Sequence, residues 1–120
     1  MINATNNNWL MGHWNNSVDN YYSNGWVSSV GAGGTDNLWR IYHATGNLTS
    51  GTWQLYVNGV LYVSGGGGSV GPNGISIGFY GNVISEFSNG DCGFVGAYTR
   101  VLTQDEVTSS FNAFRGRYGL

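Results

Sequence analysis

Six acidic side chains could form a catalytic pair or bind a metal ion in this sequence: Asp19, Asp36, Glu86, Asp91, Asp105 and Glu106. Glycoside hydrolysis requires two carboxyl groups directed at one sugar ring, which alternating acids on one strand would supply. No such alternation occurs, because Glu86 and Asp91 are separated by the turn-like sequence Phe-Ser-Asn-Gly. Asp105 and Glu106 fit the first turn of a helix, where they complement the helix dipole. We therefore expect a protein that is not an enzyme.

The histidines and the cysteine give no stronger catalytic signal. His13 and His43 lie far apart in the sequence with no serine or cysteine motif beside them, which favours structural or surface roles. No clustered His and Cys spacing indicates a zinc site. Cys92 is the only cysteine, so it excludes an internal disulfide and is interpreted as a small buried hydrophobic residue.

Calcium is the metal that the loop acids could bind. Asp19, Asp36 and Asp91 lie beside asparagines and loop carbonyl groups, and Ca²⁺ prefers such oxygen ligands. The competing interpretation, which is favoured, is that these three are solvated loop carboxylates.

The front of the chain combines aromatic rings with neutral amides. Sugar rings stack on aromatic side chains, and their hydroxyl groups bond to uncharged amides, so this composition suits carbohydrate binding. The candidate binding residues are Trp9, Trp14, Tyr21, Tyr22, Trp26, Asn15 and Asn16. Most aromatic residues of a small β protein pack in its core, and this is the expectation for Trp39, Trp53, Phe79 and Phe94. Core packing and subunit contacts therefore remain the favoured interpretation for the front aromatics as well.

The charge and the apolar pattern of the chain argue against two classes of protein. Charged residues are 8% of the sequence, there is no lysine, and the formal net charge is −2. Nucleic-acid binding needs clustered cations, which four dispersed arginines do not supply. No apolar run reaches the ~18 residues of a membrane span, and the first ten residues do not resemble a signal peptide. We expect residues 1–120 to form one domain that neither binds nucleic acid nor inserts into a membrane.

Alternating apolar residues and turn signals predict a series of short antiparallel strands. The clearest is the hairpin of residues 53–63, where Asn58-Gly59 favours a type I′ turn. Further strands are expected in residues 38–45, 75–81 and 92–99 and in two front segments, with a tight turn at Asn24-Gly25. This pattern predicts an all-β antiparallel sandwich.

Residues 102–120 carry the signals of one short helix. Thr103 and Glu106 have the spacing of a capping box, and Leu102 lies where a hydrophobic staple begins. An apolar stripe follows at helical spacing: Val107, Phe111 and Phe114. Gly116 is predicted to end the helix in a left-handed conformation.

Three segments from this half of the chain resemble a known family. "QLYVNGVL", "ISIGFYG" and "GDCGFVGAYTRVLTQDEV" are similar to the C-terminal half of the concanavalin A-like jelly roll in its laminin G-like form. The positions that fit the last strand and helix of that family are Gly90, Val95, Tyr98, Arg100, Leu102 and Thr103. The positions that depart from it are Cys92, Phe94, Ala97 and Thr99. Phe94 replaces an acidic residue that this strand often carries, so no role of that carboxylate is transferred.

The resemblance implies a jelly roll closed by a C-terminal helix. Complete domains of this family are usually longer, so either the first strands are absent or a neighbouring chain completes an edge. The ending "FNAFRGRYGL" resembles the tails of such domains in bacteriophage virion proteins, including tail fibres and capsid-associated adhesins. The resemblance thus implies a non-enzymatic decoration or fibre module on the extracellular virion surface, associating as a homo-oligomer or with other virion subunits. The alternative is an adhesin domain that binds a cell-surface glycan, with calcium as a candidate ligand.

Overall fold

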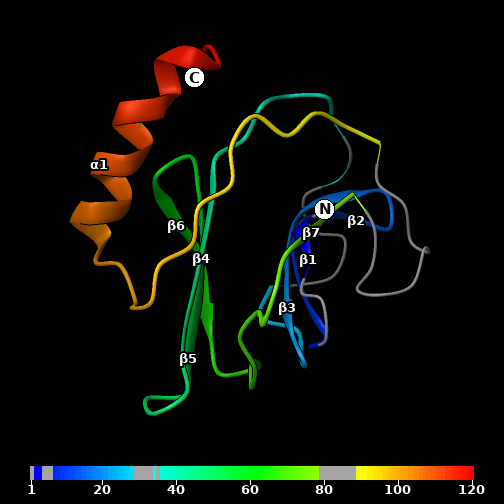
Figure 1. Cartoon of the computed structure of the whole chain (residues 1–120), viewed down its shortest axis with the longest axis vertical. Helices are drawn as coiled ribbons and strands as arrows, with labels where there is room; N and C mark the ends of the chain where they lie inside the picture. Colours follow the sequence, from blue (N-terminus) through cyan, green and yellow to red (C-terminus); the bar gives the residue numbers. More distant parts are fainter. Residues whose placement is uncertain (1, 4–6, 29–33, 35, 79–88) are drawn as a thin grey trace.

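The computed structural model describes residues 2–3, 7–28, 34, 36–78 and 89–120, which form two antiparallel sheets and a C-terminal helix (Figure 1). The first sheet has the order β3-β2-β1-β7, formed by Ser17–Ser23, Trp9–Trp14, Ile2–Asn3 and Ser76–Ile77. The second has the order β4-β5-β6, formed by Tyr42–Asn47, Thr52–Val57 and Val60–Gly65. Helix α1 spans Gln104–Phe114 and continues into a 3₁₀ turn at Arg115–Arg117. The expected β-rich chain with one short C-terminal helix is confirmed.

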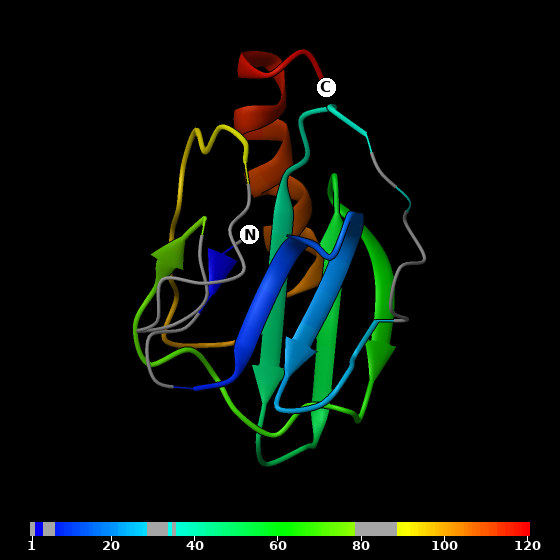
Figure 2. The same cartoon turned by 90° about the vertical axis from the view of Figure 1, so that its right-hand side faces the viewer.

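The sheets and the helix are stacked in three layers. Figures 1 and 2 show β4–β6 in the middle, with the first sheet on one side and α1 on the other. The core between the sheets contains Trp9, Tyr21, Val27, Trp53 and Leu55. A smaller cluster of Tyr56, Leu102 and Val107 joins the opposite face of the second sheet to α1. Alternate side chains of β5 therefore pack against different layers, because successive residues of a strand point to opposite faces.

The β5–β6 hairpin turns at Asn58-Gly59, as predicted. Both residues have left-handed backbone angles, with φ of 52° and 80°, which a type I′ turn requires. The turn also anchors the start of β4, since the amide of Ile41 donates to Oδ1 of Asn58 over 2.9 Å. A Cβ atom at Gly59 would lie 2.9 Å from the ring of Phe111, so glycine allows α1 to approach the turn.

The start of α1 follows the sequence prediction, whereas its end does not. The amide of Glu106 donates to Thr103 Oγ1 over 3.3 Å, and the amide of Thr103 donates to Glu106 Oε2 over 2.8 Å, which completes the capping box. The prediction that Gly116 stops the helix is wrong, because residue 116 lies inside the 3₁₀ turn. The left-handed residue is Gly119, with φ of 70°.

Removing the cap should have a modest and local effect. We expect Thr103→Ala to lower the free energy of unfolding by about 1 kcal/mol, because the amide of Glu106 loses its side-chain acceptor. Urea denaturation of the variant and the wild-type chain measures this difference. Thr108→Ala, at an exposed position inside α1, is the matched control and should change stability by less than ~0.5 kcal/mol. Equal effects of the two substitutions would contradict the role of the cap.

Three residues expected in the interior lie on the surface instead. Trp39 is 41% exposed, Phe94 is 57% exposed, and Cys92 is also exposed. Residues 38–41 and 92–99 form no strand, so the alternating apolar residues in these segments do not build one face of a sheet. In the first segment, the amide of Leu38 donates to Oδ1 of Asp36, and this local turn replaces a sheet pairing.

Part of the predicted strand at 75–81 is described and forms the two-residue strand β7. Phe79 and Glu86, named above as a core residue and a carboxylate, lie outside the described residues. Within the described part of the chain, no helix has the length and apolar character needed to cross a bilayer.

Candidate functional site

The β2–β3 hairpin presents two predicted binding residues to solvent. Asn15 and Asn16 form its turn with φ of 48° and 58°, and both side chains are exposed. Asparagine tolerates this left-handed conformation better than most residues, so the pair suits a type I′ turn. The hydroxyl of Ser17 donates to the carbonyl of Trp14 over 2.9 Å. The hairpin end therefore holds two amide side chains in a defined position.

Three of the predicted aromatic residues pack on one another, and we term Trp14, Tyr22 and Trp26 the hairpin aromatic cluster. Trp14 directly precedes the turn, whereas Tyr22 pairs with Leu10 near the other end of the hairpin. The ring centroids of Trp14 and Trp26 are 5.3 Å apart, and those of Tyr22 and Trp26 are 5.0 Å apart in an edge-to-face arrangement. An isolated β-bridge between Tyr22 and Trp26 holds their backbones together. All three side chains are half-buried, so each keeps part of its ring at the surface.

The other two aromatic candidates belong to the core. Trp9 and Tyr21 are 6% and 1% exposed, and their rings pack edge to face with centroids 5.8 Å apart. The hydroxyl of Tyr21 donates to the carbonyl of Thr45 over 3.1 Å, which links the two sheets. Burial raises the pKa of Tyr21 to about 12. These two rings therefore stabilise the fold and present no face to a ligand.

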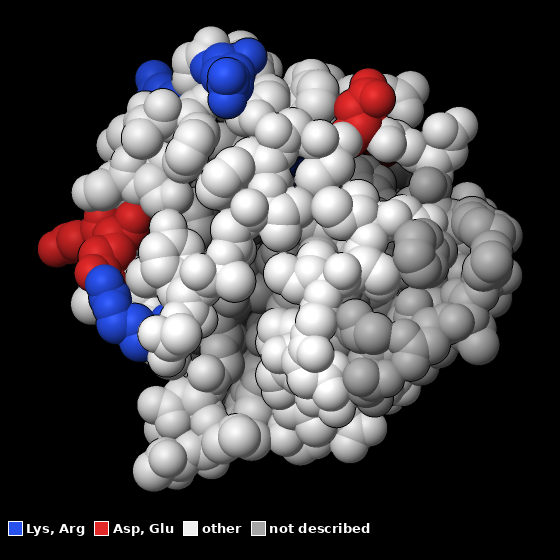
Figure 3. Space-filling model, in the orientation of Figure 1, with Lys and Arg blue, Asp and Glu red and all other residues white. Residues whose placement is uncertain are grey.

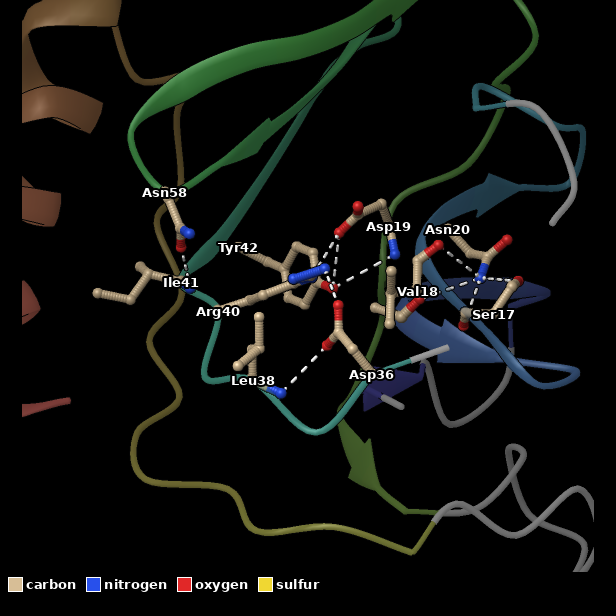
Figure 4. Close-up of polar contacts among 11 residues, drawn as sticks. Ser17, Val18, Asp19, Asn20, Asp36, Leu38, Arg40, Ile41, Tyr42 and Asn58 are labelled. Atoms are coloured by element: carbon tan, nitrogen blue, oxygen red, sulfur yellow. Dashed lines mark hydrogen bonds and ion pairs between the residues drawn. The ribbon is translucent and has the colours of Figure 1, made fainter. Parts of the chain in front are cut away.

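Two of the predicted metal ligands meet at one arginine, and we term Asp19, Asp36, Arg40 and Tyr42 the Arg40 cluster (Figure 4). Nε of Arg40 lies 3.1 Å from Oδ1 of Asp19, and its Nη2 forms an ion pair with Oδ2 of Asp36. The hydroxyl of Tyr42 donates to Oδ1 of Asp19 over 2.9 Å. The same hydroxyl accepts from the amide of Asp19 over 3.3 Å. The cluster thus joins the first sheet to the segment that enters the second.

Local backbone irregularities direct these side chains toward one another. The pairing of β2 with β3 shifts register between Gly12 and Trp14, and the partner segment there contains Asp19 with φ of 61°. Such a bulge redirects the side chain of an extra residue. Asp36 accepts from the amide of Leu38 over 3.1 Å while it also pairs with Arg40.

The charges of the cluster act on its titratable neighbours. Burial, followed by the negative charge of Asp19, raises the pKa of Tyr42, so its hydroxyl keeps the proton that it donates. Burial lowers the pKa of His13, and the positive charge of Arg40 acts in the same direction. His43, in the second sheet, lies 2.9 Å from the hydroxyl of Ser110 through Nε2, and burial lowers its pKa also.

The three candidate metal ligands therefore do not form one group. Asp19 and Asp36 flank the guanidinium of Arg40, which compensates their charge, and Asp91 is exposed in another part of the chain. Within the described ranges, no three His, Cys, Asp or Glu side chains are grouped as metal ligands. Calcium binding stays a prediction.

Comparison of the chain with known family models, curated protein sequences and solved structures finds no match. The laminin G-like relationship inferred from the C-terminal motifs thus stays a prediction.

The sequence interpretation missed Arg40, Tyr42 and Asn20. Asn20 is fully buried in β3, and its Nδ2 lies 2.8 Å from Oγ and 3.0 Å from the carbonyl oxygen of Ser17, so it ties down the hairpin end. One signal for Arg40 was available: it is the only cationic Lys or Arg before residue 100, and Asp36 precedes it by four positions.

Proposed function

We propose that this chain is a non-enzymatic structural module that associates with further copies of itself at the surface of a bacteriophage virion, as a decoration or fibre domain. The setting rests on the resemblance of its C-terminal segments to phage laminin G-like domains. The association rests on the apolar surface of the second sheet, which is the observation that carries the proposal.

That apolar surface follows β6, the last strand of the second sheet among the described strands. Val60 is 68% exposed, and Leu61 and Tyr62 are also exposed. The strand contains no charged residue and no proline, the features by which isolated edge strands usually avoid pairing. An uncharged strand with exposed apolar side chains is typical of a surface that another subunit covers.

The scarcity of charge supports close packing of many copies. The face in Figure 3 is mostly uncharged, with a few separated acidic and basic groups. Dense arrays of like-charged subunits repel one another, whereas a chain with a net charge of −2 packs with little repulsion.

The carboxylates with described partners have structural roles, which supports the non-enzymatic proposal. Asp19 and Asp36 pair with Arg40, and Glu106 pairs with Arg100 and completes the helix cap. For the fold, we propose the jelly-roll form of a β-sandwich. Its support is the core that both sheets share.

Association through β6 is tested by sedimentation velocity over a range of concentrations. We expect the wild-type chain to form oligomers whose mass rises with concentration. Val60→Lys should lower that mass, because a charge at this exposed edge opposes strand pairing. Leu48→Lys, at an exposed apolar residue in the β4–β5 loop, is the control and should leave the mass unchanged. A monomeric wild-type chain, or an unaffected Val60→Lys variant, would contradict the proposal.

A second candidate function is glycan binding, which the hairpin aromatic cluster favours. Three half-buried rings, of which Trp14 adjoins the exposed amides, combine a stacking surface with hydrogen-bonding groups, as sugar recognition requires.

We expect the wild-type chain to bind members of a printed glycan array and Trp26→Ala to bind them about tenfold more weakly, because the central ring of the cluster is lost. Trp39→Ala removes an exposed tryptophan elsewhere and serves as the control. Repeating the array with a chelator tests the calcium prediction. Absence of glycan binding, or equal losses in both variants, would contradict this function.

A further inference from the structure

Helix α1 is held against the outer side of the second sheet by a small contact (Figure 1). Val107 is the one buried residue of the helix, and it packs with Tyr56 of β5 and with Leu102. An isolated helix of eleven residues is marginal in water, so α1 depends on this packing for its own stability. A modest change in the docking energy therefore shifts α1 between a docked and a released state.

Side-chain hydrogen bonds at Gln104 and Ser110 also hold α1 in place. Nε2 of Gln104 donates to the carbonyl oxygen of Gly59 over 2.9 Å. Further along the helix, the hydroxyl of Ser110 lies 2.9 Å from Nε2 of His43 in β4. Of the groups in these two contacts, His43 is the one whose charge changes between about pH 5 and 8.

The site of His43 suits a neutral ring and not a charged one. Its Nδ1 atom is buried and has no hydrogen-bond partner within the described part of the chain. A neutral ring can carry its single proton on Nε2, where the Ser110 hydroxyl accepts it. Protonation adds an N–H group at Nδ1 that has no acceptor, and it places a positive charge in a half-buried position. Both costs fall when α1 leaves and water reaches the ring.

Among the described residues, no charged group compensates a protonated His43. Tyr56 lies directly opposite it on β5, and the hydroxyl of Tyr56 donates to Oε1 of Gln54. On the side of α1, Arg100 and Glu106 pair with each other over 2.8 Å. The titratable groups that line a groove with Ser110 are Tyr98, Arg100, Asp105 and Glu106. None of these charges contributes to the lowered pKa of His43, which is caused by burial.

We propose that His43 is a pH-sensitive switch, which holds α1 on the second sheet while its ring is neutral and releases the helix when the ring is protonated. Release uncovers the cluster of Tyr56, Leu102 and Val107. Tyr56 pairs with the exposed Leu61 of β6, so the uncovered surface adjoins the apolar strand described above. The switch goes beyond the proposed association and does not depend on it.

The direction of the pH effect follows from the pKa of His43 in the two states. In the released state the ring lies in water, and its pKa is near the ordinary value of about 6.5. In the docked state burial lowers the pKa, so the released state binds the proton more tightly. Docking is therefore strongest above about pH 6.5, and the docking equilibrium weakens by at most about tenfold for each pH unit below it.

Hydrogen exchange of the full-length chain at about pH 7.5 and about pH 5, corrected for the intrinsic pH dependence of exchange, tests the switch. We expect the amides of α1 to lose protection about threefold or more at the lower pH, whereas those of β5 keep theirs. His43→Gln, whose side chain stays neutral, should remove this acid effect. His13→Gln is the matched control, because burial also lowers the pKa of His13 but this residue lies in β2 of the first sheet, so the acid effect should remain.

Circular dichroism shows whether both variants fold. If His43→Gln does not, an NMR titration of the wild-type chain provides the test, since the His43 ring and the α1 amides should shift with one midpoint. Unchanged protection of α1, an equal loss in β5, or an acid effect that persists in His43→Gln would overturn the switch. Separate midpoints in the titration, or an acid effect that disappears in His13→Gln, would overturn it as well.

Discussion

Replacing Arg40 with glutamine should lower the free energy of unfolding by about 3 kcal/mol, because two carboxylates then lose the charge that compensates them. The side chains of Arg40 and Asp19 are only 15% and 11% exposed, so water replaces little of the lost interaction. Asp36 is more exposed and should contribute less. Urea denaturation at neutral pH measures the loss.

Three comparisons separate this effect from the removal of any arginine. Arg117→Gln, at an exposed position, should change stability by less than ~0.5 kcal/mol. Adding Asp19→Asn to Arg40→Gln should recover part of the loss, because the unpaired charge is removed as well. The pKa of His13 should rise in Arg40→Gln, since the arginine's positive charge contributes to lowering it and the carboxylates raise it. An unchanged His13 titration would indicate that the cluster does not form.

Truncating Leu55 should destabilise the chain by about 2–5 kcal/mol, because its side chain is fully buried between the two sheets and Leu55→Ala leaves a cavity. Leu48→Ala makes the same chemical change at a residue that is 72% exposed and should have almost no effect. Thermal or urea unfolding of the two variants provides the measurement. Similar losses in both would mean that the sheets do not share the core.

Features specified by a few adjacent residues were predictable from the sequence. The Asn58-Gly59 turn and the Thr103–Glu106 cap each depend on two side chains acting on nearby backbone groups, and both are present. The β-rich class with a terminal helix follows from the same local signals. Leu102, before the helix, and Val107, in the helix, also belong to one buried cluster, as the staple pattern predicts.

Features that depend on contacts between distant segments were not predictable. The ring of Trp39 packs at a tilt against Tyr118 at the surface, with centroids 4.8 Å apart, although aromatic residues usually indicate a core. The position of Asp19 depends on a bulge in the β2–β3 pairing, which leaves no mark in composition or periodicity. Only the pairing of Asp36 with Arg40 had a local signal, and that signal was their spacing.

The position of β1 between β2 and β7 has a consequence for how the chain folds. The second sheet joins three strands that follow one another directly, whereas β1 pairs Ile2 with Ile77 from the opposite side of that meander. Sequence-local contacts form early, and pairing across a long loop is slow because the loop entropy must be lost first. During synthesis on a ribosome, β4–β6 can therefore form early, whereas one edge of β1 in the first sheet stays unpaired until β7 has been made. The last pairing of the first sheet is then that of β7 with β1, which joins Ser76–Ile77 to Ile2–Asn3 across the completed second sheet.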